Sequence, residues 1–478
     1  MIDPGEKIKS YLSNLFGEEY LSRFIELINS EPSQYIRINS LKTSVGEVRK
    51  NLSERYGIET EEIPEFPLAL KVTKGTELTG KTLEHILGYI YIQGLSSMIP
   101  AQILAPTEND IVLDLCAAPG SKTTQLAEMM RNKGTLIANE IQLSRLKALV
   151  YNVERMNILN TGIVHQKGEL LSKVYQNYFD KILVDAPCSG LGIIQKKEEV
   201  VKWWDEKIVK NLSELQIKLL VSAIKMLKPG GEIVYSTCTL TAEENEFVLN
   251  KVLSKYPVKL IDINPSVKNI NAFTSYKDEN FNNDLLKGKR ILPWETNSDG
   301  FFVSKLRKTD ETEGPERISF TKREVKFISY NHKNLFSKIK FLCDYFNVDE
   351  EIFSHFKFIL KGIDIYFTNE NWIDENPGMF ERIGLKFGTI DNKGEIVLSA
   401  EAAQLFSDKI MNHIITLNSP DELKTYMEGG IIKTDIYPEG QYIIKYKDYF
   451  LGTAVVTKAG IKSRFPRSKR TQSIKTDI

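Results

Sequence analysis

Cysteine and histidine are scarce in this chain of 478 residues, which contains four cysteines and five histidines. The cysteines are Cys116, Cys188, Cys238 and Cys343, and no two of them form a C-x-x-C pair. A structural zinc site needs clustered ligands, and a disulfide framework is typical of small secreted chains. The sequence therefore predicts neither, and we expect no metal site.

Long apolar runs are absent as well. No stretch of about 18 uncharged apolar residues occurs, so the sequence predicts no membrane-spanning helix. The first twenty residues carry several charges and lack the apolar core of a signal peptide. We therefore expect a reduced, cytoplasmic protein. Nothing indicates a coiled coil or an obligate interface, so we also expect a monomer.

An excess of charge of one sign is missing too, because 63 Lys and Arg residues balance 63 Asp and Glu residues. This balance excludes a uniformly basic nucleic-acid coat. The charge is nevertheless uneven: residues 1–100 sum to −3, 101–308 to +4, 309–457 to −7 and 458–478 to +6. The basic tail leaves room for a local strip that binds a polyanion.

The pattern of apolar residues divides the chain into regions. Residues 1–100 combine helical spacing with short strand-like runs, which predicts a small α+β lobe. Residues 101–308 alternate strands and helices, which is typical of a parallel sheet covered on both faces. The polar segment 309–320, which contains TDETEGPER, is the best linker. Residues 321–478 predict a second α+β domain that ends in the basic tail. The overall fold class is α/β.

Chemically versatile residues follow the strands of the predicted parallel sheet, where ligands bind in such folds. The turn DLCAAPGSKT follows the first strand, and its small residues allow a close approach to a ligand. Glu140 follows the second strand and can accept the hydroxyls of a ribose. Asp185 and Cys188 follow the fourth strand, and Cys238 follows the fifth. The chain has no G-x-G-x-x-G and no G-x-x-x-x-G-K-[ST], which disfavours dinucleotide and P-loop sites.

Each candidate also has a purely structural interpretation. A lone cysteine is usually a small buried apolar residue, and we favour that interpretation for Cys343. For Cys116 we favour a packing or backbone role. Asp185 alone could be a helix cap, and Lys122 alone could be a solvated charge. For Cys188 and Cys238, the position at adjacent strand ends favours a functional role.

Four segments resemble the Nol/Nop/Sun family of RNA cytosine-5 methyltransferases: VLDLCAAPGSKTTQLA, ILVDAPCSGLG, KPGGEIVYSTCTLTAEENE and DGFFVSKLRK. The resemblance covers roughly residues 35–308. It implies a Rossmann-like core that uses S-adenosylmethionine, between a small α+β RNA-binding N-terminal lobe and a C-terminal domain. Residues 321–478 resemble more weakly the PUA-like RNA-binding extension of bacterial ribosomal-RNA members, through GLKFGTIDNKGEIVLSAEAA and IKSRFPRSKR.

The resemblance also implies roles for three residues. Cys238 is the expected nucleophile, because a thiolate that adds to carbon 6 of cytosine activates carbon 5. Cys188 is expected to assist the release of the adduct, and Asp185 to hydrogen-bond the base. The target base must leave its stack to reach the pocket.

The same resemblance implies a cofactor-binding set, which is Cys116, Ala117, Ala118, Pro119, Gly120, Ser121, Lys122, Glu140, Arg145 and Asp185. Ser121 stands where the family usually has a second glycine, which is a small change. After the third strand the segment HQKGEL lacks the acid that commonly contacts adenine; Glu169 would replace it only if the turn shifts. Gly94 stands where the family usually has an acidic residue.

The expected substrate is structured RNA, with ribosomal RNA favoured over transfer RNA and a ribosomal subunit as one context. We predict an RNA-binding set of Arg37, Lys462, Arg464, Arg467, Lys469 and Arg470. Phe465 could stack on a base, and Asn39 and Lys42 could line an RNA path. The structural alternatives are a solvated terminus for the tail and a surface ion pair for Arg37.

Two other functions stay open from the sequence. A DNA cytosine methyltransferase would use the Pro-Cys cysteine, Cys188, as its nucleophile, and the Thr-Cys motif argues against it. A non-catalytic RNA-binding or ribosome-assembly factor would keep a decayed cofactor site, and the altered turn after the third strand is its only support.

Overall fold

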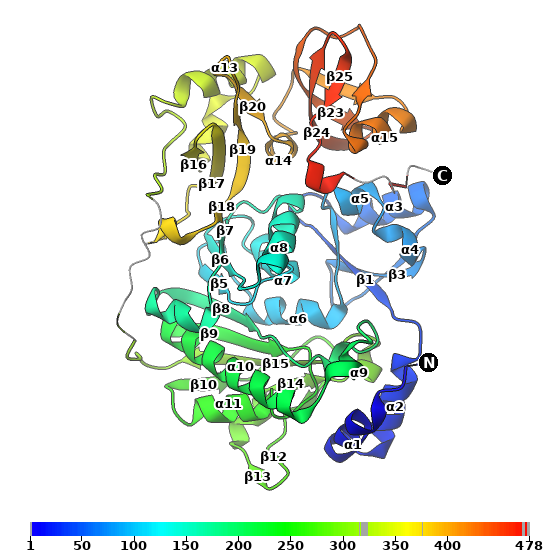
Figure 1. Cartoon of the computed structure of the whole chain (residues 1–478), viewed down its shortest axis with the longest axis vertical. Helices are drawn as coiled ribbons and strands as arrows, with labels where there is room; N and C mark the ends of the chain where they lie inside the picture. The colour runs from blue at the N-terminus through cyan, green and yellow to red at the C-terminus, as the bar shows by residue number, and fades with distance from the viewer. Residues whose placement is uncertain (1, 315, 317–323, 375, 471–473, 476–478) are drawn as a thin grey trace.

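The computed structural model describes residues 2–314, 316, 324–374, 376–470 and 474–475. A large central sheet occupies the middle of the molecule, with the C-terminal sheets above it and the N-terminal sheet to one side (Figure 1). Residues 315 and 317–320 of the predicted linker lie outside the described residues. Its remaining residues, 309–314 and 316, form neither helix nor strand.

The central sheet has ten strands in the order β11-β14-β15-β9-β8-β5-β6-β7-β18, with β10 paired to β15. Its five parallel strands are β5 (Ile111–Asp114), β6 (Thr135–Asn139), β7 (Thr161–Val164), β8 (Phe179–Asp185) and β9 (Leu227–Thr237). The antiparallel strand β15 (Phe301–Lys308) lies beside β9. The alternation of strands and helices therefore gives the α/β core that the sequence predicts.

Helices cover both faces of this sheet, and the strands bury side chains on both sides. Val112 belongs to the core under α6 (Leu95–Leu104), α7 (Ser121–Met129) and α8 (Leu143–Arg155). Its neighbour Leu113 belongs to the opposite core, under α10 (Glu206–Met226) and α11 (Glu246–Leu253). Successive strand residues point to opposite faces, so a strand buried on both sides is apolar throughout, as IVL in β5 is.

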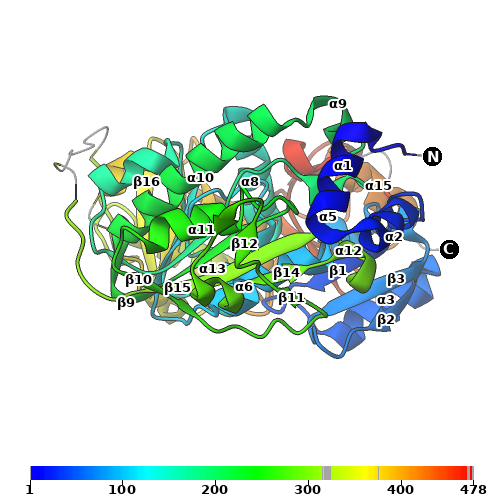
Figure 2. The ribbon, with the colours of Figure 1, turned by 90° about the horizontal axis from the view of Figure 1, so that it is seen from below.

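The N-terminal region does not form one lobe over residues 1–100. A four-stranded sheet, β2-β3-β1-β4, packs with α3 (Val45–Tyr56). The hairpin of α1 (Gly5–Phe16) and α2 (Glu18–Ile28) instead packs on the central domain, beside α9 and α12 (Figure 2). Its apolar residues Ile8 and Phe24 share a core with Leu240, close to Cys238. Helical spacing predicts an apolar face but not the partner that covers it.

The remaining short elements of this half follow the same sheets. The N-terminal sheet consists of β1 (Gln34–Ile38), β2 (Glu59–Glu62), β3 (Ala69–Lys74) and β4 (Ile90–Ile92), with the short helices α4 (Thr76–Thr79) and α5 (Leu83–Ile86). The central domain adds α9 (Val200–Trp203), α12 (Pro293–Thr296), β10 (Val258–Ile261), β11 (Ile270–Asn271) and β14 (Lys289–Ile291). A separate two-stranded ribbon consists of β12 (Ser275–Tyr276) and β13 (Glu279–Asn280).

The described part of residues 321–478 contains two sheets rather than one α+β unit. The first comprises β16 (Phe356–Lys361), β17 (Asp364–Asn369), β19 (Leu385–Ile390) and β20 (Ile396–Leu398), packed with α13 (Phe336–Phe346). The second comprises β21 (Ile414–Leu417), β22 (Ile431–Ile432), β23 (Gly440–Tyr446), β24 (Tyr449–Thr457) and β25 (Gly460–Ser463), with α15 (Pro420–Glu428). The intervening helix is α14 (Ala400–Leu405).

This region also adds a strand to the central sheet. β18 (Arg382–Ile383) pairs with β7, the outermost of the five parallel strands in the sheet. The C-terminal region is therefore joined to the core by backbone hydrogen bonds as well as by the linker. Among the described residues, no helix is long and apolar enough to cross a membrane.

Candidate active site

Two cysteines meet at the carboxyl ends of the neighbouring strands β8 and β9. The Sγ atoms of Cys188 and Cys238 are 2.9 Å apart, and both residues are free thiols. The backbone N–H of Cys238 donates to Cys188 Sγ at 3.3 Å. Asp185 and Ser236 are register partners on the two parallel strands, so the loops that follow begin side by side. The sequence predicted that the two cysteines follow adjacent strands, and the structure places their sulfur atoms in contact.

The two thiols cannot easily ionise together at this distance. The hydrogen bond with Cys238, with burial as a second cause, raises the pKa of Cys188 well above its ordinary value. This direction favours the protonated thiol of Cys188 near neutral pH, and a protonated thiol is a poor nucleophile.

Asp185 ends β8 beside the cysteines and has two partners. Its Oδ1 accepts from Ser236 Oγ at 2.8 Å, and its Oδ2 lies 2.7 Å from Lys122 Nζ. Lys122 also donates to Ser97 Oγ at 2.9 Å and lies over the Phe301 ring. Burial alone would lower the pKa of Lys122, but the Asp185 carboxylate outweighs it and the pKa is raised. A permanent cation therefore lies next to the thiol pair.

The turn after β5 is a small-residue loop fixed by main-chain contacts. It contains a cis peptide bond between Ala118 and Pro119. Gly120 has a φ of 105°, which side-chain-bearing residues rarely adopt, and a Cβ there would lie 3.0 Å from Leu149. Arg145 donates to the carbonyl of Ala118, which places it behind the turn.

Two buried acids flank this turn. Glu140 is 3% exposed at the end of β6, where its Oε1 accepts from the backbone N–H of Gln142 at 2.7 Å. Asp114 ends β5, and its Oδ2 accepts from Thr123 Oγ1 at 2.7 Å. Its Oδ1 has no hydrogen-bond partner among the described residues. Burial raises the pKa of Asp114 to about 7. Asp114 was not among the residues predicted for the site, although an acid that ends the first strand was the available signal.

The loop after β7 carries no acid at residues 165–168. His165 Nε2 lies 2.8 Å from the carbonyl oxygen of Ile141, and Gln166 donates its backbone N–H to Asn139 Oδ1. Lys167 is exposed, and Glu169 lies half-buried in the short helix η1 (Gly168–Lys173). The nearest acid in this segment is therefore Glu169, within η1.

The structure contradicts the RNA-binding role predicted for Arg37. Arg37 is 2% exposed and forms a buried ion pair with Glu128. Its guanidinium also donates to Gln93 Oε1 and Thr124 Oγ1, each at 2.8 Å. β1 lies against α7, a tertiary contact that the local sequence does not reveal. Arg37 therefore stabilises the contact between β1 and α7, and its guanidinium is not available to bind phosphate.

Two neighbouring polar residues, the buried Asn39 and the half-buried Lys42, also donate to groups within the protein. The Asn39 amide donates to the carbonyls of Gly88 and Met156. The Lys42 ammonium donates to the carbonyls of Leu87 and Arg155 and to Asn157 Oδ1, which uses all its donors. Neither side chain is available to an RNA path.

The basic tail is only partly exposed. Lys469 is buried and lies 2.7 Å from Glu401, and Phe465 is 1% exposed, so the predictions that these two residues contact RNA are wrong. A chain end that folds back onto the domain buries residues that composition alone would place in solvent. The exposed basic residues of the predicted set are Lys462, Arg464, Arg467 and Arg470.

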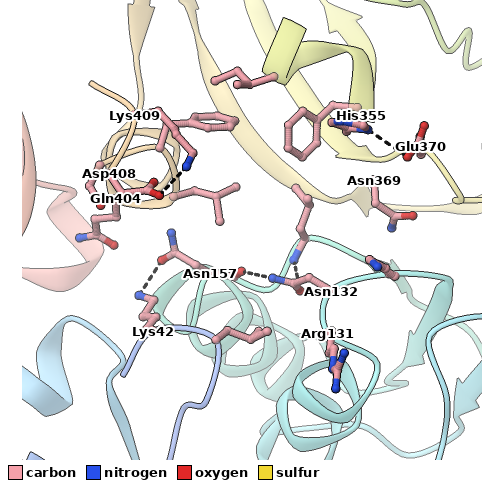
Figure 3. A pocket seen from close by; sticks show the side chains of 18 of the residues that line it. Lys42, Arg131, Asn132, Asn157, His355, Asn369, Glu370, Gln404, Asp408 and Lys409 are labelled. Atoms are coloured by element: carbon pink, nitrogen blue, oxygen red, sulfur yellow. Dashed lines mark hydrogen bonds and ion pairs between the residues drawn. The ribbon is translucent and has the colours of Figure 1, made fainter. Parts of the chain in front are cut away.

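A cleft of about 1090 Å³ is lined by neither Cys188 nor Cys238. It lies between the central domain and the C-terminal sheets, where the labelled Lys42 and Asn157 face Gln404 and Lys409 (Figure 3). The ionisable residues that line it are Lys42, Arg131, Lys133, Asp349, Glu351, His355, Glu370, Asp408 and Lys409. Apart from His355, four are basic and four are acidic, and this balance does not favour a polyanion.

Comparison with known proteins extends this picture. The model of the family described as "16S rRNA methyltransferase RsmB/F" matches residues 101–307. The chain is 31% identical over 465 residues to ribosomal RNA small subunit methyltransferase F of Shewanella piezotolerans, covering 95% of this chain and 94% of the relative. It is 36% identical over 274 residues to the tRNA (cytosine(49)-C(5))-methyltransferase of Pyrococcus abyssi, covering 57% of this chain and 87% of that one.

Solved structures agree with the fold of the core. A methyltransferase homolog from Pyrococcus horikoshii is 33% identical with a TM-score of 0.56, covering 63% of this chain and 93% of that one. NSun6 from Pyrococcus horikoshii, determined with SFG, is 25% identical with a TM-score of 0.55, covering 64% of this chain and 99% of that one.

The Rossmann-like sheet, the small-residue turn and the pair of thiols define a methyltransferase of the S-adenosylmethionine-dependent class. The similarity along nearly the whole chain makes the class more specific. The chain belongs to the Nol/Nop/Sun family of RNA cytosine-5 methyltransferases.

Proposed function

We propose that this enzyme methylates carbon 5 of a cytidine in small-subunit ribosomal RNA, in the cytoplasm, through a covalent adduct with Cys238. The observation that carries the proposal is the 2.9 Å approach of Cys188 and Cys238 beside Asp185. The relative named for small-subunit ribosomal RNA matches 95% of this chain, whereas the tRNA relative matches 57%. Because the longer match includes the C-terminal sheets, ribosomal RNA is the better candidate.

The residues around the β5 turn fit S-adenosylmethionine. The loop from Cys116 to Lys122 offers backbone groups, Glu140 offers a buried carboxylate for ribose hydroxyls, and Asp114 keeps an unpartnered Oδ1 beneath the turn. Arg145 would act indirectly, by holding the Ala118 carbonyl. When bound, the cofactor supplies an electrophilic methyl group.

Cys238 is the nucleophile in this proposal. Its sulfur forms a bond to carbon 6 of the flipped cytosine, and the electrons of the carbon 5–carbon 6 double bond move so that carbon 5 becomes nucleophilic. The proton that the Cys238 thiol loses is taken up by the ring at N3, so the addition balances. Asp185 accepts hydrogen bonds from that N3–H and from the exocyclic amine, while Lys122 balances its charge. The adduct is thus stabilised by groups that are already in place.

Cys188 acts in the second half of the reaction. Release requires the proton on carbon 5 to leave while the bond between carbon 6 and the Cys238 sulfur breaks, returning its electron pair to that sulfur. Cys188 lies beside Cys238. Its thiol passes its own proton to solvent, and the resulting thiolate accepts the carbon 5 proton. The N3 proton returns to the Cys238 sulfur, so both cysteines are thiols again and the site is reset.

The proposal is tested by bisulfite sequencing of 16S ribosomal RNA, offered either naked or within the small subunit, after incubation with enzyme and S-adenosylmethionine. We expect one or more cytidines to become protected with the wild type and none with Cys238→Ala. A transfer-RNA pool and a DNA duplex serve as competing substrates. Protection only in one of these competitors, or full activity of Cys238→Ala, would contradict the proposal.

A further inference from the structure

The segment after Cys238 folds back on both cysteine loops. Glu244 and Asn245 lie at the start of α11, and both are 0% exposed. Among the described residues, neither side chain has a hydrogen bond to the turn of residues 116–122. Their side chains instead contact the residues that flank the two thiols.

Asn245 holds the loop of the nucleophile. Its Oδ1 accepts from Thr237 Oγ1 at 2.6 Å, and its Nδ2 donates to the Thr239 carbonyl at 3.2 Å. Thr237 and Thr239 are the two chain neighbours of Cys238. One side-chain amide therefore links the Thr237 hydroxyl and the Thr239 carbonyl, which lie on the two sides of that thiol.

Glu244 holds the loop of the second cysteine. Its Oε1 accepts from the backbone N–H of Ser189 at 2.8 Å and from Gln216 Nε2 at 2.9 Å. The Gln216 amide also donates to the Pro187 carbonyl at 2.9 Å. Pro187 and Ser189 are the two chain neighbours of Cys188. Glu244 and Gln216 together therefore hold the backbone on both sides of that residue.

The arrangement is costly, which argues that it serves the site. Glu244 has no ion pair among the described residues, and burial raises its pKa. Its Oε2 accepts only from Thr241 Oγ1, at 2.7 Å. A buried carboxyl without a cation opposes folding unless it is fully hydrogen-bonded. A hydrogen bond between Ser189 Oγ and Thr239 Oγ1, at 2.8 Å, also joins the two cysteine loops.

We propose that Glu244 and Asn245 are positioning residues that set the two thiols separately, Asn245 for attack by Cys238 and Glu244 for release by Cys188. This inference rests on the proposed two-cysteine reaction. It assigns opposite kinetic signatures to two consecutive residues. Loss of Asn245 slows formation of the adduct, and loss of Glu244 slows its breakdown.

The experiment separates the two steps with the full-length enzyme. RNA that carries 5-fluorocytidine at the target stalls after methylation, because no proton is present on carbon 5, so it measures adduct formation alone. Ordinary RNA measures turnover and the adduct present at steady state on denaturing gels. The variants are Glu244→Ala, Glu244→Gln and Asn245→Ala. Cys188→Ala serves as the release-defective reference.

We expect Glu244→Ala to form the fluorocytidine adduct at nearly the wild-type rate, to turn over at least about 10-fold more slowly, and to accumulate adduct on ordinary RNA. Glu244→Gln restores most of the turnover, because an amide oxygen still accepts from Ser189 and Gln216. Asn245→Ala slows adduct formation by at least about 10-fold and accumulates none.

A matched control is Glu84→Gln, which changes another buried carboxyl, one that accepts from Tyr449 in the contact between α5 and β24. It should alter the melting temperature without altering the ratio of adduct formation to release. If Glu244→Ala does not fold, Gln216→Ala is tested instead and should also slow release.

Failure of the proposed function and failure of the positioning assignment would give different results. If Cys188→Ala itself accumulates no adduct while Cys238 is active, the proposed function is wrong. If Cys188→Ala accumulates adduct but folded Glu244→Ala or Gln216→Ala does not, or if Asn245→Ala slows only release, the positioning assignment is overturned.

Discussion

Buried charges determine much of this site at the scale of single residues. Arg37, Glu128, Asp114 and Glu244 are all at most 5% exposed, and each is charged in its ordinary state near neutral pH. The sequence marked the cysteines and Asp185, because their motifs and strand ends coincide. It did not mark Glu244 or Asp114, because a lone acid in a sequence is usually a solvated surface charge.

Asp114→Asn should change how stability depends on pH. The unfolded carboxyl titrates near 3.8 and the folded one near 7, so between these values the folded state binds a proton that the unfolded state lacks. The wild-type free energy of unfolding therefore falls as pH rises through this window, by up to about 1.4 kcal/mol per pH unit. Asp114→Asn removes that term.

The measurement is urea denaturation of both proteins at several pH values from 4 to 8. The buried His85, whose pKa is lowered to about 3, contributes the opposite slope below pH 6.5, but it contributes equally to both proteins. We expect the variant to gain stability relative to the wild type as pH rises. A constant difference across the series would contradict the assignment.

Arg37→Ala should damage stability and not RNA affinity directly. Removal of one partner from a buried ion pair leaves Glu128 uncompensated, at a cost of about 3–5 kcal/mol. Arg464→Ala, at an exposed position, should leave the melting temperature unchanged and weaken RNA binding with a shallower salt dependence. Calorimetry and filter binding at two salt concentrations compare them. Normal stability of Arg37→Ala with weak RNA binding would restore the surface role.

At the scale of elements, the strands of the core could be predicted from the sequence, whereas the contact between Gly192 and Gly300 could not. Apolar runs such as IVLD and KILVD end in turn residues, and this pattern places β5 and β8 directly. The close approach of Gly192 to Gly300 joins segments more than a hundred residues apart. The Gly300 N–H donates to the Gly192 carbonyl at 2.8 Å, and the Gly192 N–H donates to the Cys238 carbonyl at 3.1 Å.

Gly192→Ala should therefore disturb the catalytic loop. A Cβ at this position would lie 2.2 Å from the Gly300 carbonyl oxygen and 2.8 Å from that of Cys238, so backbone must move. We expect a loss of about 1–3 kcal/mol of stability and a fall in methyl transfer on the order of 100-fold.

Gly46→Ala is the matched control for this change. Gly46 lies in α3, and a Cβ added there would have nothing within 4 Å. Alanine should therefore stabilise that helix by about 0.5–1 kcal/mol without changing activity. The comparison uses thermal melts and initial methyl-transfer rates. Equal rates in the two variants would show that the glycine contact does not position Cys238.

At the scale of the whole molecule, the sequence predicted the order of the regions but not how they pack. The α1–α2 hairpin lies on the central domain and β18 extends its sheet, because apolar faces and strand edges are covered by whichever partner the complete fold presents. The zero net charge likewise concealed which basic residues face solvent. Lys469 and Lys462 are seven residues apart, yet only the second is exposed.

A chain that ends at Lys308 should be less stable than the full chain. Removal of the C-terminal region takes β18 from the edge of the sheet and Thr368 from the Leu159 carbonyl, which it contacts at 3.0 Å. Buried apolar residues of β7 would then face water. We expect a lower melting temperature and concentration-dependent aggregation by light scattering. An unchanged melting temperature would show that the two parts are independent domains.

The central claim is that Cys238 forms the bond to RNA and Cys188 breaks it. The most direct measurement is a denaturing gel of Cys188→Ala, Cys238→Ala and the double variant, each incubated with substrate RNA and S-adenosylmethionine. We predict a protein–RNA band with Cys188→Ala alone. A band with Cys238→Ala, or its persistence in the double variant, would contradict the account.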